Sequence, residues 1–241
     1  MENLYIVIPA YNEQETIQRV IEQWYPVVSQ IGADSRLVIV NDGSKDNTYE
    51  IMLECTKSRP QLIALSKENS GHGATLLYAY HYALEHEANY VFQTDSDGQT
   101  LADEFWPFWE QRKEFDMIIG YRNQRKDGIS RIFVTRILKL VIKICFGEKI
   151  TDANTPFRLM EGKILKQNLY LVPENFNLSN VILSVIYAKK KLKVKYIPIT
   201  FRPRQGGVNS INLKKITRIG IQAVKDFKKI NKTLRKIEID V

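Results

Sequence analysis

The chain has 241 residues, of which 44% are hydrophobic and 26% charged, a composition that is typical of a globular domain. It contains no run of about 18 uncharged apolar residues, so the sequence predicts no membrane-spanning helix. The net charge of +8 conceals two unlike parts: residues 1–110 carry 6 Lys and Arg against 17 Asp and Glu, and residues 111–241 carry 29 against 10. An acidic part joined to a basic part indicates two anionic partners, one bridged by a metal ion and one attracted directly by Lys and Arg.

The N-terminus and the cysteines favour a cytoplasmic protein. Met1–Leu4 has no basic region of the kind that opens a signal peptide. Cys55 and Cys145 lie far apart within helical patterns, so we expect buried thiols and no disulfide framework. None of the histidines stands at zinc-binding spacing from a cysteine.

The first 120 residues alternate between apolar strands and helices. We expect strands at 4–8, 37–40, 62–65, 90–93 and 117–119, and helices at about 12–28, 47–57 and 71–87. Asn12, followed by Glu15, predicts a capping box at the first helix. Continuous apolar strands between helices indicate an α/β fold with a doubly wound, mostly parallel sheet. The loops after such strands meet at one edge, where ligands bind.

The second half is less regular. We expect helices at 129–146, 176–187 and 213–236, and a strand at 192–200. No repeat or flexible linker is evident. We therefore expect one domain over residues 1–210, followed by a basic amphipathic helix within residues 211–241.

Two carboxylates follow the fourth strand, in the run Thr94–Gln99. Asp95 and Asp97 are separated by one residue, and Gly98 lets the chain turn, so both side chains can face one point. This arrangement suits a hard divalent cation, which takes oxygen ligands and is often shared with phosphates. Taken alone, such a run is also typical of a turn or a helix cap.

The other strand ends carry polar residues as well. Pro9–Glu13 could form a platform for a nucleobase, or simply a helix entry. Asn41–Thr48 could accept the N–H of uracil or guanine, and the same loop suits a turn with Asp46 as cap. Asn69–Thr75 is a glycine-containing helix start that could approach phosphate through backbone N–H groups, or allow close packing. The fingerprints of dinucleotide oxidoreductases and P-loop nucleotidases are absent from the sequence.

In order and spacing these four loops resemble the family 2 glycosyltransferases with the GT-A fold. The resemblance implies a UDP- or GDP-linked sugar donor bound by a Rossmann-like half, residues 1–120, and inverting transfer by direct displacement. It also implies a Mg²⁺ or Mn²⁺ ion near Asp97 and Gln99, with Asp95 beside it, which stabilises the leaving diphosphate. The residues it places around the donor are Pro9, Ala10, Tyr11, Glu13, Val40, Asp42, Asn69, Gly71, Asp95, Ser96 and Asp97.

The second half narrows the resemblance. Asp152–Leu159 is similar to a segment of the polyprenyl-phosphate sugar synthases of the dolichol-phosphate mannosyltransferase type, and Ile197–Phe201 begins a block similar to their next one. Two departures are a lysine missing near the end of that block and an acidic residue missing around Phe176–Leu178. Arg158 and Arg204 could instead form salt bridges to Asp152 or Glu161. The residues implied to bind an acceptor phosphate are Arg122, Arg131, Thr135, Arg158, Arg204 and Ser210.

Acceptor chemistry gives an independent argument. A hydroxyl acceptor must lose a proton to a base, and the Glu-Asp pair of many hydroxyl-using relatives is absent from this sequence. A phosphate acceptor is already an anion and needs only to be bound, which a cluster of arginines would do. We therefore expect transfer to a polyprenyl phosphate or lipid-linked glycan, with Asp97, Asp152 and Arg158 as catalytic residues. Asp152 is the base candidate for the alternative, a sugar hydroxyl in a capsule or surface polysaccharide.

A lipid acceptor requires contact with a membrane. The helices expected at 129–146 and 213–236 could lie in the interface, where each Lys or Arg contributes about 1 kcal/mol near anionic lipid. Alternatively they pack on the domain or form a homo-oligomer interface. We expect a peripheral enzyme at the cytoplasmic membrane face, or one with a membrane protein partner. A catalytically silent relative is disfavoured because Asp95 and Asp97 are both present, and no nucleic-acid partner is expected without interleaved aromatic residues.

Overall fold

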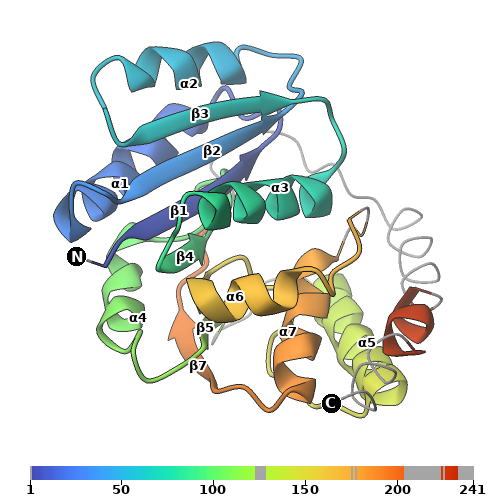
Figure 1. Cartoon of the computed structure of the whole chain (residues 1–241). Helices are drawn as coiled ribbons and strands as arrows, with labels where there is room; N and C mark the ends of the chain where they lie inside the picture. The colour runs from blue at the N-terminus through green and yellow to red at the C-terminus, as the bar shows by residue number, and fades with distance from the viewer. Residues whose placement is uncertain are drawn as a thin grey trace.

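The computed structural model of the chain shows one mixed sheet with helices on both of its faces (Figure 1). The strand order is β3-β2-β1-β4-β6-β5-β7. The structure describes residues 2–122, 129–174, 176, 178–203, 224 and 226–232, and of residues 129–135 it describes the backbone only.

The first four strands are parallel, as predicted. Alternate side chains of each strand face opposite sides of the sheet. Along β1, Leu4, Ile6 and Ile8 join one hydrophobic cluster while Tyr5 and Val7 join the other. The strands of this half are β1 (Leu4–Ala10), β2 (Arg36–Asp42), β3 (Leu62–Lys67) and β4 (Tyr90–Gln93), and its helices are α1 (Ile17–Ile31), α2 (Thr48–Thr56) and α3 (His72–Glu85).

The second half adds three strands and completes both helical layers. β6 runs antiparallel to β4 and β5, whereas β5 and β7 are parallel. The helices α1, α2 and α4 pack on one face of the sheet, and α3, α5, α6 and α7 on the other. These elements are β5 (Met117–Arg122), β6 (Arg158–Glu161), β7 (Val194–Ile199), η1 (Ala102–Phe105), α4 (Trp106–Glu110), α5 (Ile129–Phe146), α6 (Gly162–Leu169) and α7 (Ser179–Lys189).

Three local predictions differ from the structure. The strand β6 and the helix α6 were not expected, because β6 is only four residues long and begins with an arginine. The predicted capping box at Asn12 is wrong, since α1 begins at Ile17 and Asn12 has a φ of 54°. Of the helix expected at 213–236, the described residues 226–232 are helical, and the rest lies outside the described residues, as does the expected boundary at 210.

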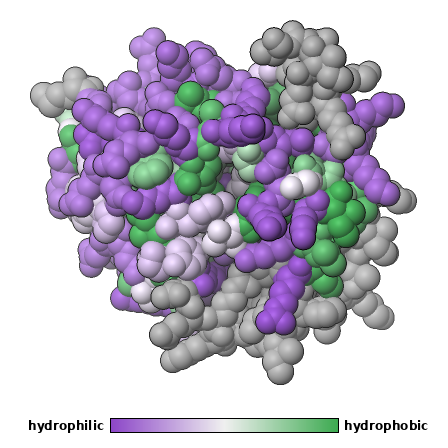
Figure 2. All heavy atoms as spheres, turned by 90° about the horizontal axis from the view of Figure 1, so that it is seen from below, coloured by the Kyte–Doolittle hydropathy of each residue, from purple (hydrophilic) through white to green (hydrophobic). Residues whose placement is uncertain are grey.

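The surface carries few large apolar side chains. On the face seen from below in Figure 2, hydrophobic groups reach the surface between hydrophilic ones. Within the described residues, three exposed aliphatic side chains belong to one helix, α5: Ile137, Leu140 and Ile144 are 44%, 56% and 73% exposed. Among the helices that the structure describes, none is long and apolar enough to cross a bilayer.

Candidate active site

The loops after β1 and β2 are joined to each other at the carboxyl edge of the sheet. The main-chain N–H of Asn12 donates to Ser44 Oγ at 3.0 Å, and the N–H of Lys45 donates to Asn12 Oδ1 at 2.8 Å. The N–H of Glu13 donates to Thr48 Oγ1 at 2.8 Å. Asn12 therefore connects two loops instead of capping a helix, and the loops predicted to surround the nucleoside form one unit.

The first loop also reaches the loop after β4. Thr16 Oγ1 lies 2.8 Å from Glu13 Oε2 and 3.0 Å from the carbonyl oxygen of Ser96. Glu13, which the resemblance places around the donor, is buried with 6% of its surface exposed, and its carboxylate has a protein partner in this structure. The contact through Thr16 joins the predicted nucleoside side to the predicted metal side.

The remaining residues expected at the nucleoside lie in two environments. Tyr11 is 42% exposed beyond the end of β1, where its ring is available for stacking. Pro9, Ala10 and Val40 are buried at strand ends, and the side chains of Ala10 and Val40 belong to the hydrophobic clusters. A ligand at this edge would meet these two residues through their main chain.

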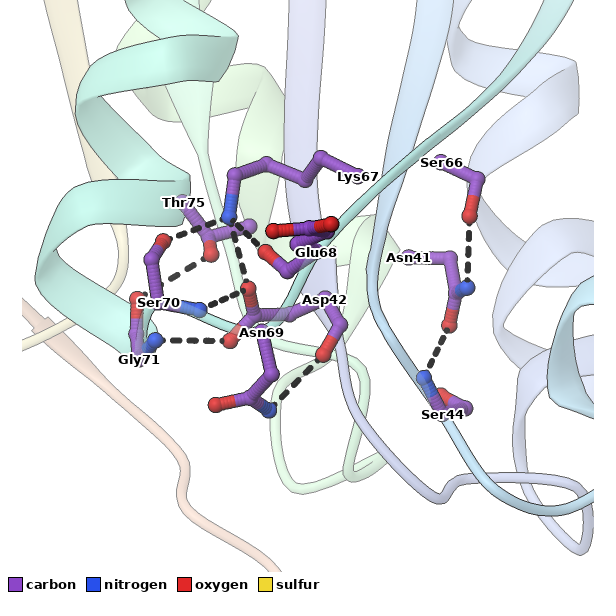
Figure 3. Close-up of polar contacts among 10 residues, drawn as sticks. All are labelled: Asn41, Asp42, Ser44, Ser66, Lys67, Glu68, Asn69, Ser70, Gly71 and Thr75. Atoms are coloured by element: carbon purple, nitrogen blue, oxygen red, sulfur yellow. Dashed lines mark hydrogen bonds and ion pairs between the residues drawn. The ribbon is translucent and has the colours of Figure 1, made fainter.

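Asp42 is the centre of a dense polar network (Figure 3). Its Oδ1 accepts hydrogen bonds from Lys67 Nζ at 2.8 Å and from the N–H of Ser70 at 2.9 Å, and its Oδ2 accepts from the N–H of Gly71 at 2.9 Å. Its carbonyl oxygen accepts from Asn69 Nδ2 at 2.8 Å. Burial raises the pKa of Asp42, but the bonds from Lys67 and Ser70 outweigh burial, so the pKa of this carboxyl lies below its ordinary value.

This network changes the expectation for the loop before α3. The backbone N–H groups of Asn69–Thr75 could have faced phosphate or allowed close packing, and in the structure those of Ser70 and Gly71 donate to Asp42. Asn69 likewise contacts Asp42. The adjacent Gly43 has a φ of 64°, and a Cβ there would lie 2.8 Å from the main-chain N of Asn69, so only glycine fits this close approach. The three predicted positions Asp42, Asn69 and Gly71 are therefore brought together.

The loop after β4 carries three oxygen-bearing side chains at alternate positions. Asp95, Asp97 and Gln99 are partly exposed, whereas the intervening residues are buried. Asp97 Oδ1 accepts the N–H of Gln99 at 3.1 Å, and Gly98 has a φ of 69°. Carboxylate and amide oxygens are the ligands that Mg²⁺ and Mn²⁺ take, so these residues fit such an ion. In the described part of the chain no group of three or more His, Cys, Asp or Glu could hold a metal.

His72 lies beside this loop and was not among the predicted site residues. It is the first residue of α3, and its Nε2 lies 3.9 Å from Asp95 Oδ1. The sequence placed His72 in the glycine-containing helix start, but only the fold brings that start next to Asp95.

Arg158 does not lie as predicted. Its side chain is fully buried, and its guanidinium makes five hydrogen bonds. The acceptors are the carbonyl oxygens of Ala153, Thr155 and Asn180 and the hydroxyl of Ser184. Because a guanidinium has five N–H groups, this arrangement supports neither a contact with an acceptor phosphate nor a salt bridge to Asp152 or Glu161. Arg158 instead joins the loop 152–157 to α7.

The other expected acceptor residues are described only in part. Arg122 ends β5, with its Cζ 3.6 Å from the ring centroid of Phe201. Asp152 is 7% exposed, and its Oδ1 accepts the N–H of Asn154 at 3.3 Å. The predictions for Arg204 and Ser210 lie outside the described residues, and so do those for the side chains of Arg131 and Thr135.

A parallel half-sheet with converging polar loops, continued by an antiparallel β6, is the architecture of the GT-A fold, and solved structures share it. Glucosyl-3-phosphoglycerate synthase from Mycobacterium tuberculosis, in complex with Mn²⁺, UDP and phosphoglyceric acid, superposes with a TM-score of 0.69 at 14% identity, covering 95% of this chain and 78% of that one. More particularly, the chain belongs to glycosyl transferase family 2, whose family model matches residues 5–169.

Curated relatives extend the likeness beyond that range. An undecaprenyl-phosphate 4-deoxy-4-formamido-L-arabinose transferase of Pectobacterium carotovorum is 22% identical over 91% of this chain and 65% of its own length. A dolichyl-phosphate beta-glucosyltransferase of Trichomonas vaginalis is 27% identical over 86% of this chain and 68% of its own length. The chain thus spans about two thirds of the length of these relatives, and both of their names include a polyprenyl phosphate.

Proposed function

We propose that the protein is a metal-dependent, inverting glycosyltransferase that moves a sugar from a UDP- or GDP-linked donor to a polyprenyl phosphate or a lipid-linked glycan. The observation that carries the proposal is the loop after β4, in which Asp95, Asp97 and Gln99 are each partly exposed while the residues between them are buried. Thr16 connects this loop to the loops that would surround the nucleoside.

Each loop has a task in this proposal. Tyr11 would stack on the base, and the ionised Asp42, held in place by Lys67, would accept a base N–H. Asp97 and Gln99 would hold Mg²⁺ or Mn²⁺, with Asp95 beside them. A bound ion supplies stabilisation of the negative charge that develops on the departing diphosphate. The M. tuberculosis enzyme, which has this fold, was crystallised with Mn²⁺ and UDP-glucose, and this supports the choice of cofactor class and donor.

The acceptor is supported by the names of the two relatives, which both include a polyprenyl phosphate. Arg122 stands at the same edge of the sheet as the metal loop. A hydroxyl acceptor is the second candidate, and the position of Arg158 favours it, because a buried Arg158 removes one member of the predicted phosphate-binding cluster. Asp152 would then be the base, in a loop that Arg158 holds against α7.

Contact with an anionic membrane at the cytoplasmic face is part of the proposal. The exposed Ile137, Leu140 and Ile144 are three and four positions apart, so they share one face of α5. Arg136, Lys139 and Lys143 are exposed on the same helix. An apolar stripe flanked by basic residues suits a helix that lies in the lipid headgroup region. A membrane protein partner or a second copy of the chain would cover the same stripe.

The test is nucleotide binding by calorimetry with and without Mn²⁺, followed by transfer from the sugar donor of the nucleotide that binds. We expect UDP or GDP to bind only with the ion, and Asp97→Ala to lower the affinity at least about tenfold, because it removes a charged ligand. The control is Asp103→Ala, which removes an exposed carboxylate from η1. Metal-independent binding, or equal affinity of wild type and Asp97→Ala, would contradict the metal assignment.

A further inference from the structure

The segment that follows β7 is fixed against the metal loop by Gln99. The N–H of Arg202 donates to the carbonyl oxygen of Gln99 at 2.8 Å, and Gln99 Nε2 donates to the carbonyl oxygen of Arg202 at 2.8 Å. Both main-chain polar groups of Arg202 are therefore bound by a single residue, which stands two positions after Asp97. Any conformation that keeps these bonds holds Arg202 beside the proposed ion.

The two residues before Arg202 are fixed as well. The N–H of Thr200 lies 3.0 Å and 2.9 Å from the two carboxylate oxygens of Glu104, in η1. The ring of Phe201 carries the guanidinium of Arg122 on its face, at 3.6 Å from the ring centroid. Three consecutive residues are thus anchored, and the contacts come from three segments earlier in the sequence: the loop after β4, η1 and β5.

Arg202 itself, by contrast, is accessible to solvent. The residue is exposed, and within the described residues it forms no ion pair with a carboxylate. Arg112, by comparison, forms an ion pair with Glu2, and its Nη2 lies 2.7 Å from Glu2 Oε2. A positive charge on a firmly held main chain, next to a loop built for a diphosphate, is pre-organised for an anion, since little further ordering of the backbone is needed.

We propose that Arg202 is a further phosphate-binding residue of this active site, and that Gln99 and Glu104 position it. The inference rests on the proposed function and deepens it. The ligand is a phosphate group, which a guanidinium binds with two parallel hydrogen bonds. The group belongs either to the diphosphate of the donor or to the acceptor. The likeness to the polyprenyl-phosphate enzymes pointed to Arg204 and not to Arg202.

The test compares Arg202→Ala and Arg202→Lys with wild type, and Arg59→Ala is the matched control. Arg59 precedes β3, at the opposite end of the strands from the site. The two arms are calorimetry with UDP and GDP in the presence of Mn²⁺, and the KM for a short polyprenyl phosphate. We expect Arg202→Ala either to lower the nucleotide affinity or to raise the acceptor KM, in each case by about tenfold, as loss of a charge-assisted hydrogen bond implies. Arg202→Lys should give a value between those of Arg202→Ala and wild type.

The arm that changes identifies the source of the phosphate. A lower nucleotide affinity assigns Arg202 to the donor, and a higher acceptor KM with normal nucleotide affinity assigns it to the acceptor. Wild-type values in both arms would overturn the inference. Absence of nucleotide binding and transfer in the wild type would instead overturn the proposed function, so the two failures are distinct.

Hydrogen exchange tests the positioning role without relying on activity. Glu104→Ala should speed exchange of the Thr200 amide. It should also change the same quantity as Arg202→Ala, either the nucleotide affinity or the acceptor KM, by a smaller factor. Asp103→Ala removes the neighbouring exposed carboxylate and should do neither. Unchanged exchange at Thr200 in Glu104→Ala would overturn the role of Glu104.

Discussion

Asp42 is fixed by hydrogen bonds within the protein, and in the proposed site it would be held in place before a ligand binds. Its carboxylate holds the loop between β3 and α3 through Lys67, Ser70 and Gly71. Most of its hydrogen-bonding capacity is used within the protein, so a nucleobase would meet an acceptor whose direction is already fixed. The same bonds make Asp42 a contributor to stability.

We predict that Asp42→Asn destabilises the protein by about 1–3 kcal/mol at pH 7, because buried donors lose a charged acceptor. Since folding lowers the pKa of Asp42, its contribution is present above the ordinary carboxyl pKa of about 3.9 and is lost as the pH falls through the lower folded-state value. Urea unfolding should therefore show a difference from wild type that shrinks below about pH 4.

The control for this prediction is Asp34→Asn, which changes an exposed carboxylate. It should leave the free energy of unfolding within about 0.5 kcal/mol of wild type. A cost for Asp42→Asn that stays constant from pH 7 to pH 3 would mean that the charge of Asp42 does not contribute.

Single residues also show what the sequence could not predict. The run Asp95–Gln99 was proposed as a metal site because its chemistry is local, and in the structure Asp95, Asp97 and Gln99 are each partly exposed at the end of β4. Arg158 was assigned to a phosphate because its partners, Asn180 and Ser184, come from a helix 22 and 26 positions later. Arg202 was missed because its partner Gln99 is 103 positions away. Long-range contacts decide these two roles, and no local pattern encodes them.

At the scale of elements, Arg158 is the connection between β6 and α7. Its bonds to Ala153 and Thr155 shape the loop that carries Asp152, and its bonds to Asn180 and Ser184 attach that loop to the helix. The guanidinium donates twice to the carbonyl oxygen of Thr155, and it shares the carbonyl oxygens of Ala153 and Asn180 with the hydroxyl of Ser184. These buried bonds give Arg158 a structural role.

We predict that Arg158→Met lowers the free energy of unfolding by at least about 2 kcal/mol, because buried carbonyl groups lose their donors. Arg158→Lys should recover part of the loss, since an ammonium group cannot reproduce the planar fork. Urea unfolding measures both. A stable Arg158→Met protein with a raised acceptor KM would return Arg158 to the acceptor site.

The helix α5 leads to a prediction about membrane binding, because its exposed apolar side chains do not contribute to the core. Replacing Ile137, Leu140 and Ile144 together by serine should weaken sedimentation with vesicles that contain anionic lipid. The free energy of unfolding should change little, as for other exposed positions.

A matched triple variant replaces Leu53, Tyr78 and Tyr170 by serine, three exposed apolar residues on other parts of the surface. It should sediment with vesicles like wild type. Equal losses in the two variants would show that the attraction is general and not a property of α5.

Strands and helices were largely predictable from the sequence. The parallel strands β1 to β4 are continuous apolar runs, and such short runs are typical of strands in a parallel sheet that is buried on both faces. α5 has the expected bounds, Ile129–Phe146. β6 was missed because four residues beginning with a charged side chain give no strand signal, and only pairing with β4 and β5 makes them a strand.

At the scale of the whole molecule, the position of β6 governs how the chain can be divided. β4 and β5 do not pair with each other, because β6 lies between them, although β6 follows both in the sequence. β5 pairs with β6 and β7, and both of these strands come from residues after 157. Residues 1–120, predicted to bind the donor, and the residues that follow them therefore share one continuous sheet.

We predict that residues 1–122 alone will not form a monomer with a cooperative unfolding transition. β4 would present an unpaired edge and β5 would have no partner strand, a condition that favours aggregation. Thermal unfolding followed by circular dichroism, with sedimentation for the mass, measures this outcome. A sharp transition in a monomeric fragment would contradict it.

The same topology sets an order of events during synthesis. β5 leaves the ribosome well before β6, so it has to wait as an unpaired, apolar strand until residues 158–161 have emerged and inserted beside β4. Closing this central gap brings together Tyr90 and Glu161, a pairing of distant residues that slows folding. The interval before β6 arrives is when the nascent protein is most exposed to association with other chains.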